Sequence, residues 1–216
     1  MSLYFQFEEI TLEERLRKIA KTHAQRRTDN IVRQFVPQNA PLNPIESNYV
    51  GVIGEMAVRK FLGLDTNLDD NYENHQVDEG DLSFNGLIYD VKTDAIPSTL
   101  YQKLYNGTIQ PWDTYGCRVF TAKHLHHLKK YSGGLIFTAF EIPNDAKSTK
   151  IEGQIRPVII DNSKILIIGY VSQKDVTKNE PTWFTPANPI NGATHKYNSL
   201  NYIFHHTDLT ELKKIL

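Results

Sequence analysis

The segment DLSFNGLIYDVK, from Asp81 to Lys92, contains the pattern that decides the fold and the candidate site. Asn85-Gly86 stands between two short runs of alternating apolar and polar residues, which predicts a β-hairpin with a two-residue type I′ turn. This turn fixes the register of the two strands, so Asp81 is expected opposite Asp90. Directly opposed residues share a face of the hairpin, with their Cβ atoms roughly 5 Å apart.

Two aspartates that face each other across a hairpin repel, so a positive charge is expected beside Asp81 and Asp90. Lys92 lies two residues beyond Asp90 and points to the same face. A hard divalent cation such as Mg²⁺ also fits, because it takes carboxylate and carbonyl oxygens and leaves positions for a phosphate. Two acids and a lysine are what metal-dependent phosphodiester hydrolysis requires. The alternative without a catalytic role is that the two aspartates lie at the solvent-exposed open end of the hairpin, where Lys92 is only their salt-bridge partner.

Upstream of the hairpin, residues 49–63 predict a helix that ends at Gly63 and is apolar around most of its surface. Glu55 lies in the middle of this helix. A buried carboxylate is costly unless a cation, a hydrogen-bond network or a raised pKa compensates it. We therefore expect Glu55 to add a third acid to the site, and the alternative is an ion pair with Arg59 four residues later.

The remaining sequence predicts a single α/β domain over residues 1–216. A capping box at Thr11-Leu-Glu-Glu14 opens an amphipathic helix, which is part of a helical extension over about residues 8–45. Further helices are expected at 98–105, 122–131 and 209–216, and strands at 117–120, 135–142 and 165–171, with a short strand near 75–77.

Charge and cysteine content exclude several classes of protein. The 216 residues carry 24 basic and 25 acidic side chains, so any nucleic-acid contact must be local. Cys117 is the only cysteine, which excludes an intrachain disulfide and a cysteine metal cluster and favours a cytoplasmic protein. Apolar runs are too short to span a membrane, and no nucleotide-binding glycine motif occurs.

Local basic segments are the candidate nucleic-acid contacts. Residues 11–33 carry seven basic and three acidic side chains, and Arg26 and Arg27 are the most plausible contacts there. The plainer interpretation is a solvated helix face. A second candidate set is Lys123, Lys129 and Lys130.

Two other patterns favour structural roles. His124 and His127 have a His-x-x-His spacing, but they provide only one ligand pair, so a polar helix face is the preferred interpretation. Trp112 and Tyr115 follow Lys92 and could stack on bases, but we expect them to belong to the core.

At these residues the chain resembles the PD-(D/E)xK nuclease superfamily, which has the restriction-endonuclease-like fold. The resemblance covers about forty residues closely and rests on Gly54-Glu55, Gly80-Asp81 and Asp90-Val91-Lys92-Thr93. The later segments Ile168-Gly-Tyr-Val171 and Asp208-Leu209 are loosely similar to phage and mobile-element members. Gly80 departs from the family pattern, in which a proline often precedes the first aspartate.

The resemblance implies an α/β fold with a central mixed β-sheet flanked by helices. It also implies that Asp81, Asp90 and the backbone carbonyl of Val91 bind Mg²⁺, or Mn²⁺ in its place. Lys92 would be the catalytic lysine and Glu55 an auxiliary acid and possible further ligand. The implied partner is DNA, with a homodimer as a second expectation and the cytoplasm of a bacterial or phage-infected cell as the setting.

The sequence therefore predicts a Mg²⁺-dependent DNA endonuclease, a metal-dependent deoxyribonuclease of the PD-(D/E)xK type. One alternative is a Holliday-junction or other structure-specific resolvase that uses the same residues. The alternative from another class is a non-catalytic nucleic-acid-binding module on the same fold. The intact set of two acids and a lysine argues against the module, because a purely structural protein gains nothing from opposed aspartates.

Overall fold

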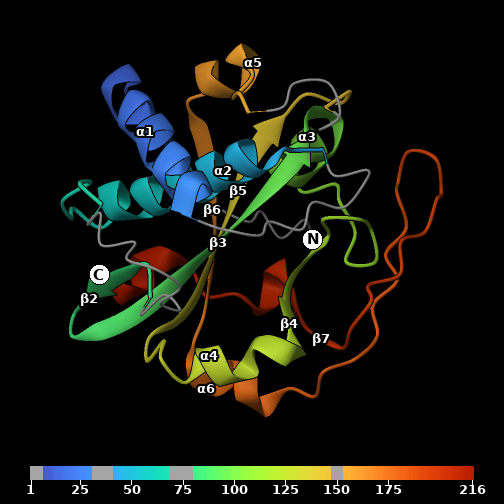
Figure 1. The fold of residues 1–216 in the computed structure, drawn as a ribbon. Coiled ribbons are helices and arrows are strands. Elements are labelled where there is room, and N and C mark those ends of the chain that lie inside the picture. The colour runs from blue at the N-terminus through green and yellow to red at the C-terminus, as the bar shows by residue number, and fades with distance from the viewer. Residues whose placement is uncertain (1–6, 31–40, 69–79, 147–152) are drawn as a thin grey trace.

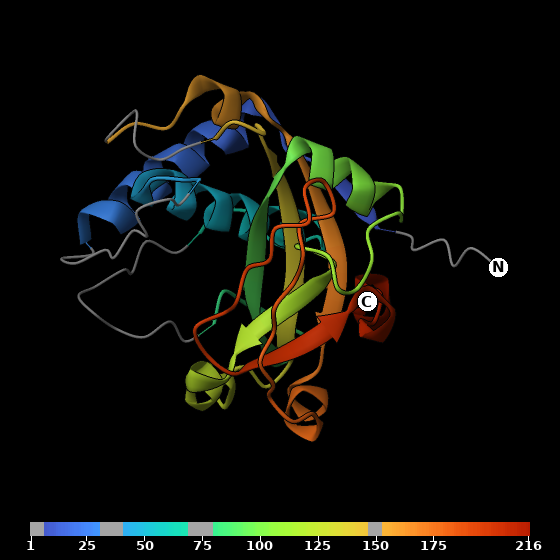
Figure 2. The same ribbon diagram turned by 90° about the vertical axis from the view of Figure 1, so that its right-hand side faces the viewer.

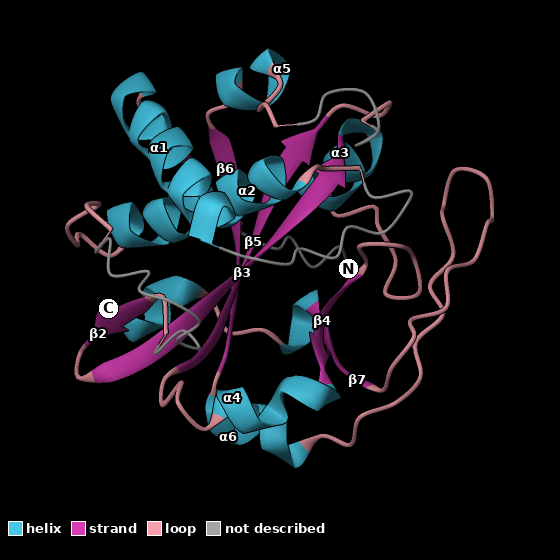
Figure 3. Cartoon of the chain, in the orientation of Figure 1, coloured by secondary structure: helices cyan, strands magenta, loops and turns pink. Residues whose placement is uncertain are grey.

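The computed structural model describes residues 7–30, 41–68, 80–146 and 153–216, and the strand expected near 75–77 lies outside these ranges. The described residues form an α/β fold with a mixed five-stranded sheet in the order β1-β6-β5-β3-β2 and a separate pair β4-β7 (Figures 1 and 3). The strands are β1 (Glu8–Thr11), β2 (Leu82–Phe84), β3 (Leu87–Pro97), β4 (Cys117–Thr121), β5 (Gly134–Ile142), β6 (Lys164–Val171) and β7 (Asn201–His205). The α-helices are α1 (Glu14–Asn30), α2 (Pro44–Phe61), α3 (Ser98–Tyr105), α4 (Leu125–Leu128), α5 (Pro157–Asp161) and α6 (Gln173–Lys178).

The hairpin forms as the sequence predicts. Asn85 and Gly86 have positive φ angles of 51° and 76°, as a type I′ turn requires. Antiparallel pairing of β2 with β3 sets Leu82 opposite Tyr89, which is the predicted register. Asp81 directly precedes β2, so it lies at the open end of this pairing.

Strand β3 is much longer than its hairpin partner. It pairs in parallel with β5 from Tyr89 to Pro97, while β2 covers only its first three residues on the other side. Within the described part of the chain, the edge of β3 beyond Tyr89 therefore has no strand partner. This open edge carries the candidate site.

Helix α2 lies across the face of the sheet that includes Thr93 and Thr138. It begins at Pro44, five residues before the predicted start, because Asn43 forms a capping box with Glu46. A Cβ atom on Gly54 would lie 1.9 Å from the Thr93 hydroxyl oxygen, so only glycine permits this close approach. The contact packs α2, the helix that carries Glu55, against the strand that carries Asp90 and Lys92.

The N-terminal segment, expected to be helical from about residue 8, instead begins with a strand. β1 pairs antiparallel with β6, and α1 follows and packs along α2. Leu12, Ala20 and Ala24 are buried in the same cluster as the apolar face of α2. Four strand residues directly before a helix cap are too few to show a clear alternation in the sequence.

The opposite face of the sheet is covered by β4, β7 and α3 (Figure 2). Phe137 of β5 packs against Phe204 of β7, with 6.0 Å between ring centroids. The helix expected at 122–131 is shorter and consists of a 3₁₀ turn followed by α4, and the closing helix at 209–216 is a 3₁₀ turn over Leu212–Ile215. Strand β7 and the short helices α5 and α6 were not predicted. No helix within the described ranges has both the length and the apolar character needed to cross a lipid bilayer.

Candidate active site at the open edge of β3

Three elements bring the predicted acids and lysine to one place on the open edge of β3. Lys92 pairs with Asp90 on the same strand, with 2.7 Å between Nζ and Oδ2. The negative charges of Glu55 and Asp90 both act on Asp81, which links α2 and both hairpin strands in one cluster. The charges of these four residues therefore act in one region although the residues are spread over 38 positions of the sequence, from Glu55 to Lys92.

Asp81 is fixed to the strand edge through its backbone and its carboxylate. Its N–H donates to the carbonyl of Tyr89 at 2.9 Å, and its Oδ2 accepts a hydrogen bond from the N–H of Val91. The Val91 N–H thus points away from β5, and in an extended strand the carbonyl of the same residue points the same way. Arg59 of α2 also binds Asp81, because its guanidinium donates a hydrogen bond to the Asp81 backbone carbonyl at 2.9 Å.

The cluster concentrates negative charge. Burial raises the pKa of Asp81 well above its usual range, and the carboxylates of Glu55 and Asp90 raise it further. The Val91 N–H and the Lys92 ammonium oppose this pKa shift without cancelling it. A cation at this edge would relieve the repulsion, so the donor set fits a hard divalent ion.

The structure assigns Glu55 a partner that the sequence did not suggest. Arg27, in the last turn of α1, makes two hydrogen bonds to the Glu55 carboxylate, at 2.7 and 2.8 Å. The Glu55 side chain is only 5% exposed, so this pair is largely shielded from water. The alternative pairing of Glu55 with Arg59 is therefore wrong, and the Arg27 guanidinium, expected as a phosphate contact, is engaged by Glu55.

No group of three or more His, Cys, Asp or Glu side chains in the described ranges is arranged to hold a metal ion. Here Glu55 is paired with Arg27, and Asp90 with Lys92. Mg²⁺ does not require three protein carboxylates, because it is usually bound by one or two of them together with waters and substrate phosphate. Asp81, Asp90 and the carbonyl of Val91 meet that smaller requirement.

The burial of Asp90 separates this arrangement from a solvated salt bridge. Asp90 is 3% exposed, whereas the side chain of its partner Lys92 is 46% exposed. An ion pair formed only for surface solubility does not bury its acid. The lysine ammonium thus lies between a buried carboxylate and solvent, where a substrate phosphate can reach it.

Gly80 departs from the family pattern for a local steric reason. Its φ angle is 113°, and a Cβ atom there would lie 2.2 Å from a methyl carbon of Ile88. Proline requires φ near −65°, so it does not fit this backbone. The glycine allows the chain to enter the hairpin and place Asp81 at the strand edge.

The basic candidates lie on two exposed surfaces. Arg26 is exposed on α1, and Lys123, Lys129 and Lys130 are exposed around α4. The pKa of His127 is lowered. The largest cause is partial desolvation of the ring, and neighbouring positive charges that include Lys92 lower it further. The α4 segment is therefore within electrostatic range of the catalytic candidates, although His124 and His127 show no metal site.

A second polar cluster, which was not predicted from the sequence, lies farther along β3. Asp94 continues the alternation of Asp90 and Lys92 and pairs with Arg118, whose side chain is fully buried. Arg118 also donates to the carbonyl of Tyr115. An arginine in the otherwise apolar strand at 117–121 was the signal for a buried partner, but the sequence does not say which acid it meets.

Because the negative charges of Glu55 and Asp90 act on Asp81, the substitution Asp81→Asn is expected to stabilise the folded protein at high pH. Because the folded state raises the pKa of Asp81, the stability from this group is present at low pH and is lost as the pH rises through that raised pKa. Without divalent metal, the variant should melt above wild type at pH 8, with the difference shrinking as the pH falls. Each kcal/mol corresponds to about 2–4 °C for a chain of this size.

The control for this measurement is Asp145→Asn, which neutralises an exposed carboxylate. It should leave the melting temperature within about 0.5 kcal/mol of wild type at both pH values. An Asp81→Asn variant that melts below wild type at pH 8 in EDTA would show that the carboxylates are not crowded.

The described site thus consists of two carboxylates and a backbone carbonyl at a strand edge, with one lysine and an arginine-bound glutamate beside them. No protein-family model, curated protein or solved structure matches the chain.

Proposed function

We propose that the protein is a Mg²⁺-dependent DNA endonuclease that hydrolyses phosphodiester bonds at the open edge of β3. The observation that carries the proposal is the meeting of Asp81 with Asp90, Lys92 and the Val91 backbone at this edge. The resemblance of the same residues to the PD-(D/E)xK superfamily supports the assignment. Each of these groups has a distinct role in the proposed chemistry.

A bound divalent cation would supply Lewis-acid polarisation of the scissile phosphate and would lower the pKa of the attacking water. Asp81, Asp90 and the Val91 carbonyl would hold that cation. The Lys92 ammonium would orient the water and stabilise the negative charge that develops on the phosphate. Glu55, held in place by Arg27, would act as the auxiliary acid.

The DNA would approach along exposed basic side chains beside the acidic cluster. The chain carries 24 basic and 25 acidic residues, so attraction to phosphates must come from a local surface. The exposed lysines Lys123, Lys129 and Lys130 around α4 suit this role because that segment is within electrostatic range of Lys92. Arg26 on α1 is the remaining candidate on the other side.

The proposal predicts that Mg²⁺ or Mn²⁺ stabilises the folded protein. A ligand that binds only the folded state at 100 times its Kd adds about 2.7 kcal/mol, so the melting temperature should rise by several degrees at saturating metal. Asp90→Asn should abolish this rise, because it removes one of the two carboxylate ligands. Thermal melts with EDTA and with increasing metal would measure both effects.

The matched control is Asp145→Asn, which should keep the full rise in melting temperature. Titration calorimetry gives an independent readout of binding. A wild-type protein that binds no divalent ion even at millimolar metal would overturn the shared cation site of Asp81 and Asp90.

A further inference from the structure

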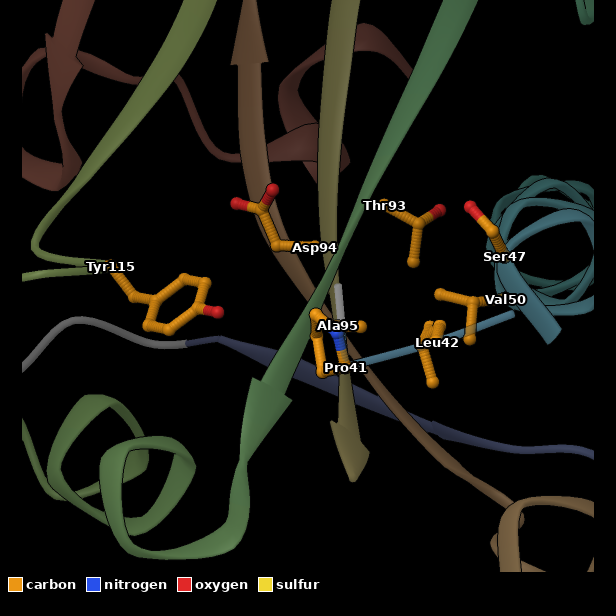
Figure 4. A pocket seen from close by; sticks show the side chains of 8 residues that line it. All are labelled: Pro41, Leu42, Ser47, Val50, Thr93, Asp94, Ala95 and Tyr115. Carbon is orange, nitrogen blue, oxygen red and sulfur yellow. The ribbon is translucent and has the colours of Figure 1, made fainter. Parts of the chain in front are cut away.

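A cavity of about 280 Å³ lies along β3 directly beyond Lys92 (Figure 4). The edge of β3 forms its centre with Thr93, Asp94 and Ala95, while Ser47 and Val50 of α2 line one side. Asp94 and Tyr115 lie on the other side of the strand, as the close view shows. The cavity therefore extends to both sides of β3, at the same open edge that carries the candidate active site.

The size and the walls of this cavity suit a single flat ring. Ligand cavities in proteins typically measure about 300–1,000 Å³, so this one is at the small end and fits one base rather than a nucleotide chain. Thr93 and Ala95 follow Val91 in the strand alternation, so their N–H and C=O groups face the open edge. Within the described ranges no strand pairs with these backbone groups.

Asp94 is the charged group of this cavity. One of its carboxylate oxygens accepts a hydrogen bond from Arg118, whose side chain is 0% exposed and cannot move away without leaving a buried charge. The Asp94 side chain is itself 44% exposed, so the carboxylate remains accessible from the cavity. It offers a fixed hydrogen-bond acceptor.

Tyr115 is held beside the cavity in an unusual backbone conformation. Its φ angle is 65°, in a region that residues other than glycine rarely adopt, and its carbonyl accepts a hydrogen bond from Arg118. Arg118 thus fixes both the acid and the aromatic residue. Such local strain is typical of functional sites.

We propose that this cavity holds the base of a nucleotide next to the scissile phosphate, with the exocyclic amine of the base donating to Asp94. The inference rests on the proposed nuclease function and adds a substrate preference to it. Lys92 and Asp94 are about 7 Å apart along the strand, so a nucleotide whose phosphate meets Lys92 can reach the cavity. Adenine, cytosine and guanine carry an exocyclic amine, whereas thymine does not.

The first test uses a short DNA duplex with 2-aminopurine placed singly at successive positions along one strand. The fluorescence of this base rises when it leaves the base stack. Binding to the Lys92→Met protein should raise the fluorescence at one position only, because a base must unstack to enter the cavity. Adding Ser47→Phe, which fills the cavity from an exposed position of α2, should remove the rise.

The second test measures cleavage of substrates that differ only in the base at that position. Wild type should cleave a substrate with purine, which lacks both the exocyclic amine and a ring N–H donor on that edge, at least about tenfold more slowly than one with adenine, since a fixed acceptor is then left without its donor. Asp94→Asn should reduce this discrimination, because an amide can donate to a ring nitrogen of purine. Asp161→Asn is the control and should preserve it, and melting temperatures show whether each variant is folded.

The outcomes separate the two proposals. Cleavage by wild type with no fluorescence rise and no discrimination between adenine and purine overturns the base-binding cavity alone. A fluorescence rise that Ser47→Phe removes, without cleavage by wild type, supports the cavity and overturns the hydrolysis. A protein that binds no DNA overturns both.

Discussion

Lys92→Met is expected to remove nearly all DNA cleavage, by a factor of about 10²–10³ or more, while Mg²⁺ and DNA still bind. Methionine keeps much of the apolar stem of lysine and removes only the ammonium. That ammonium lies beside Asp90, and the Lys92 side chain is 46% exposed, so it can reach a phosphate. Its proposed interaction matters only as negative charge develops on the phosphate, and its loss should therefore lower kcat rather than weaken substrate binding.

Lys174→Met is the matched control for this experiment, because Lys174 is exposed on α6. It should cleave DNA at the wild-type rate. A salt-bridge role for Lys92 would instead change mainly the stability, since Asp90 would lose its cationic partner. A Lys92→Met variant that cleaves at the wild-type rate would refute the catalytic role of this lysine.

Arg27→Met should destabilise the fold by about 3–5 kcal/mol, the usual result of removing one partner from a buried ion pair. The Glu55 carboxylate is 5% exposed and receives two hydrogen bonds from Arg27. Without the guanidinium, the carboxylate would remain buried next to Asp81 without compensation. Urea unfolding measures this loss of free energy directly.

Two further variants show whether the effect comes from the pair. Arg27→Met combined with Glu55→Gln should recover most of the lost stability, because no buried charge is then left uncompensated. Arg26→Met, at the neighbouring exposed position, should change the stability by no more than about 0.5 kcal/mol. Equal effects of Arg26→Met and Arg27→Met would contradict the structural role assigned to Arg27.

The hairpin and its acids were predictable because their signals are local. Asn85-Gly86 determines the turn, the turn determines the register, and the alternation of the strand places Lys92 on the face of Asp90. Strand β5 and helix α3 were also predictable from short patterns in the sequence. These features depend on residues only a few positions apart.

The partners of the buried charges were not predictable, because they come from distant parts of the chain. Arg27 pairs with Glu55 across 28 positions, and Arg118 pairs with Asp94 across 24. A count of basic residues does not show whether a guanidinium faces solvent or a buried acid. For this reason Arg26 and Arg27 looked equivalent in the sequence and differ in the structure.

The start of α2 and the existence of strand β1 were also not predictable from the sequence. The sequence pattern predicted a start at residue 49, yet Pro44 occupies the first turn of α2 behind the cap at Asn43. Strand β1 has only four residues, and its pairing with β6 is set by tertiary contact. Short elements of this kind carry too little local pattern for reliable prediction.

The most direct test of the account is a digestion series with supercoiled plasmid, linear duplex, single-stranded DNA and a four-way junction, each with Mg²⁺ and with EDTA. Wild type is expected to cleave DNA in Mg²⁺, and EDTA or Asp90→Asn is expected to stop the cleavage. Preference for the junction would identify a structure-specific resolvase that uses the same residues. Binding of DNA and Mg²⁺ without cleavage of any of the four substrates would contradict the nuclease assignment and leave a binding module.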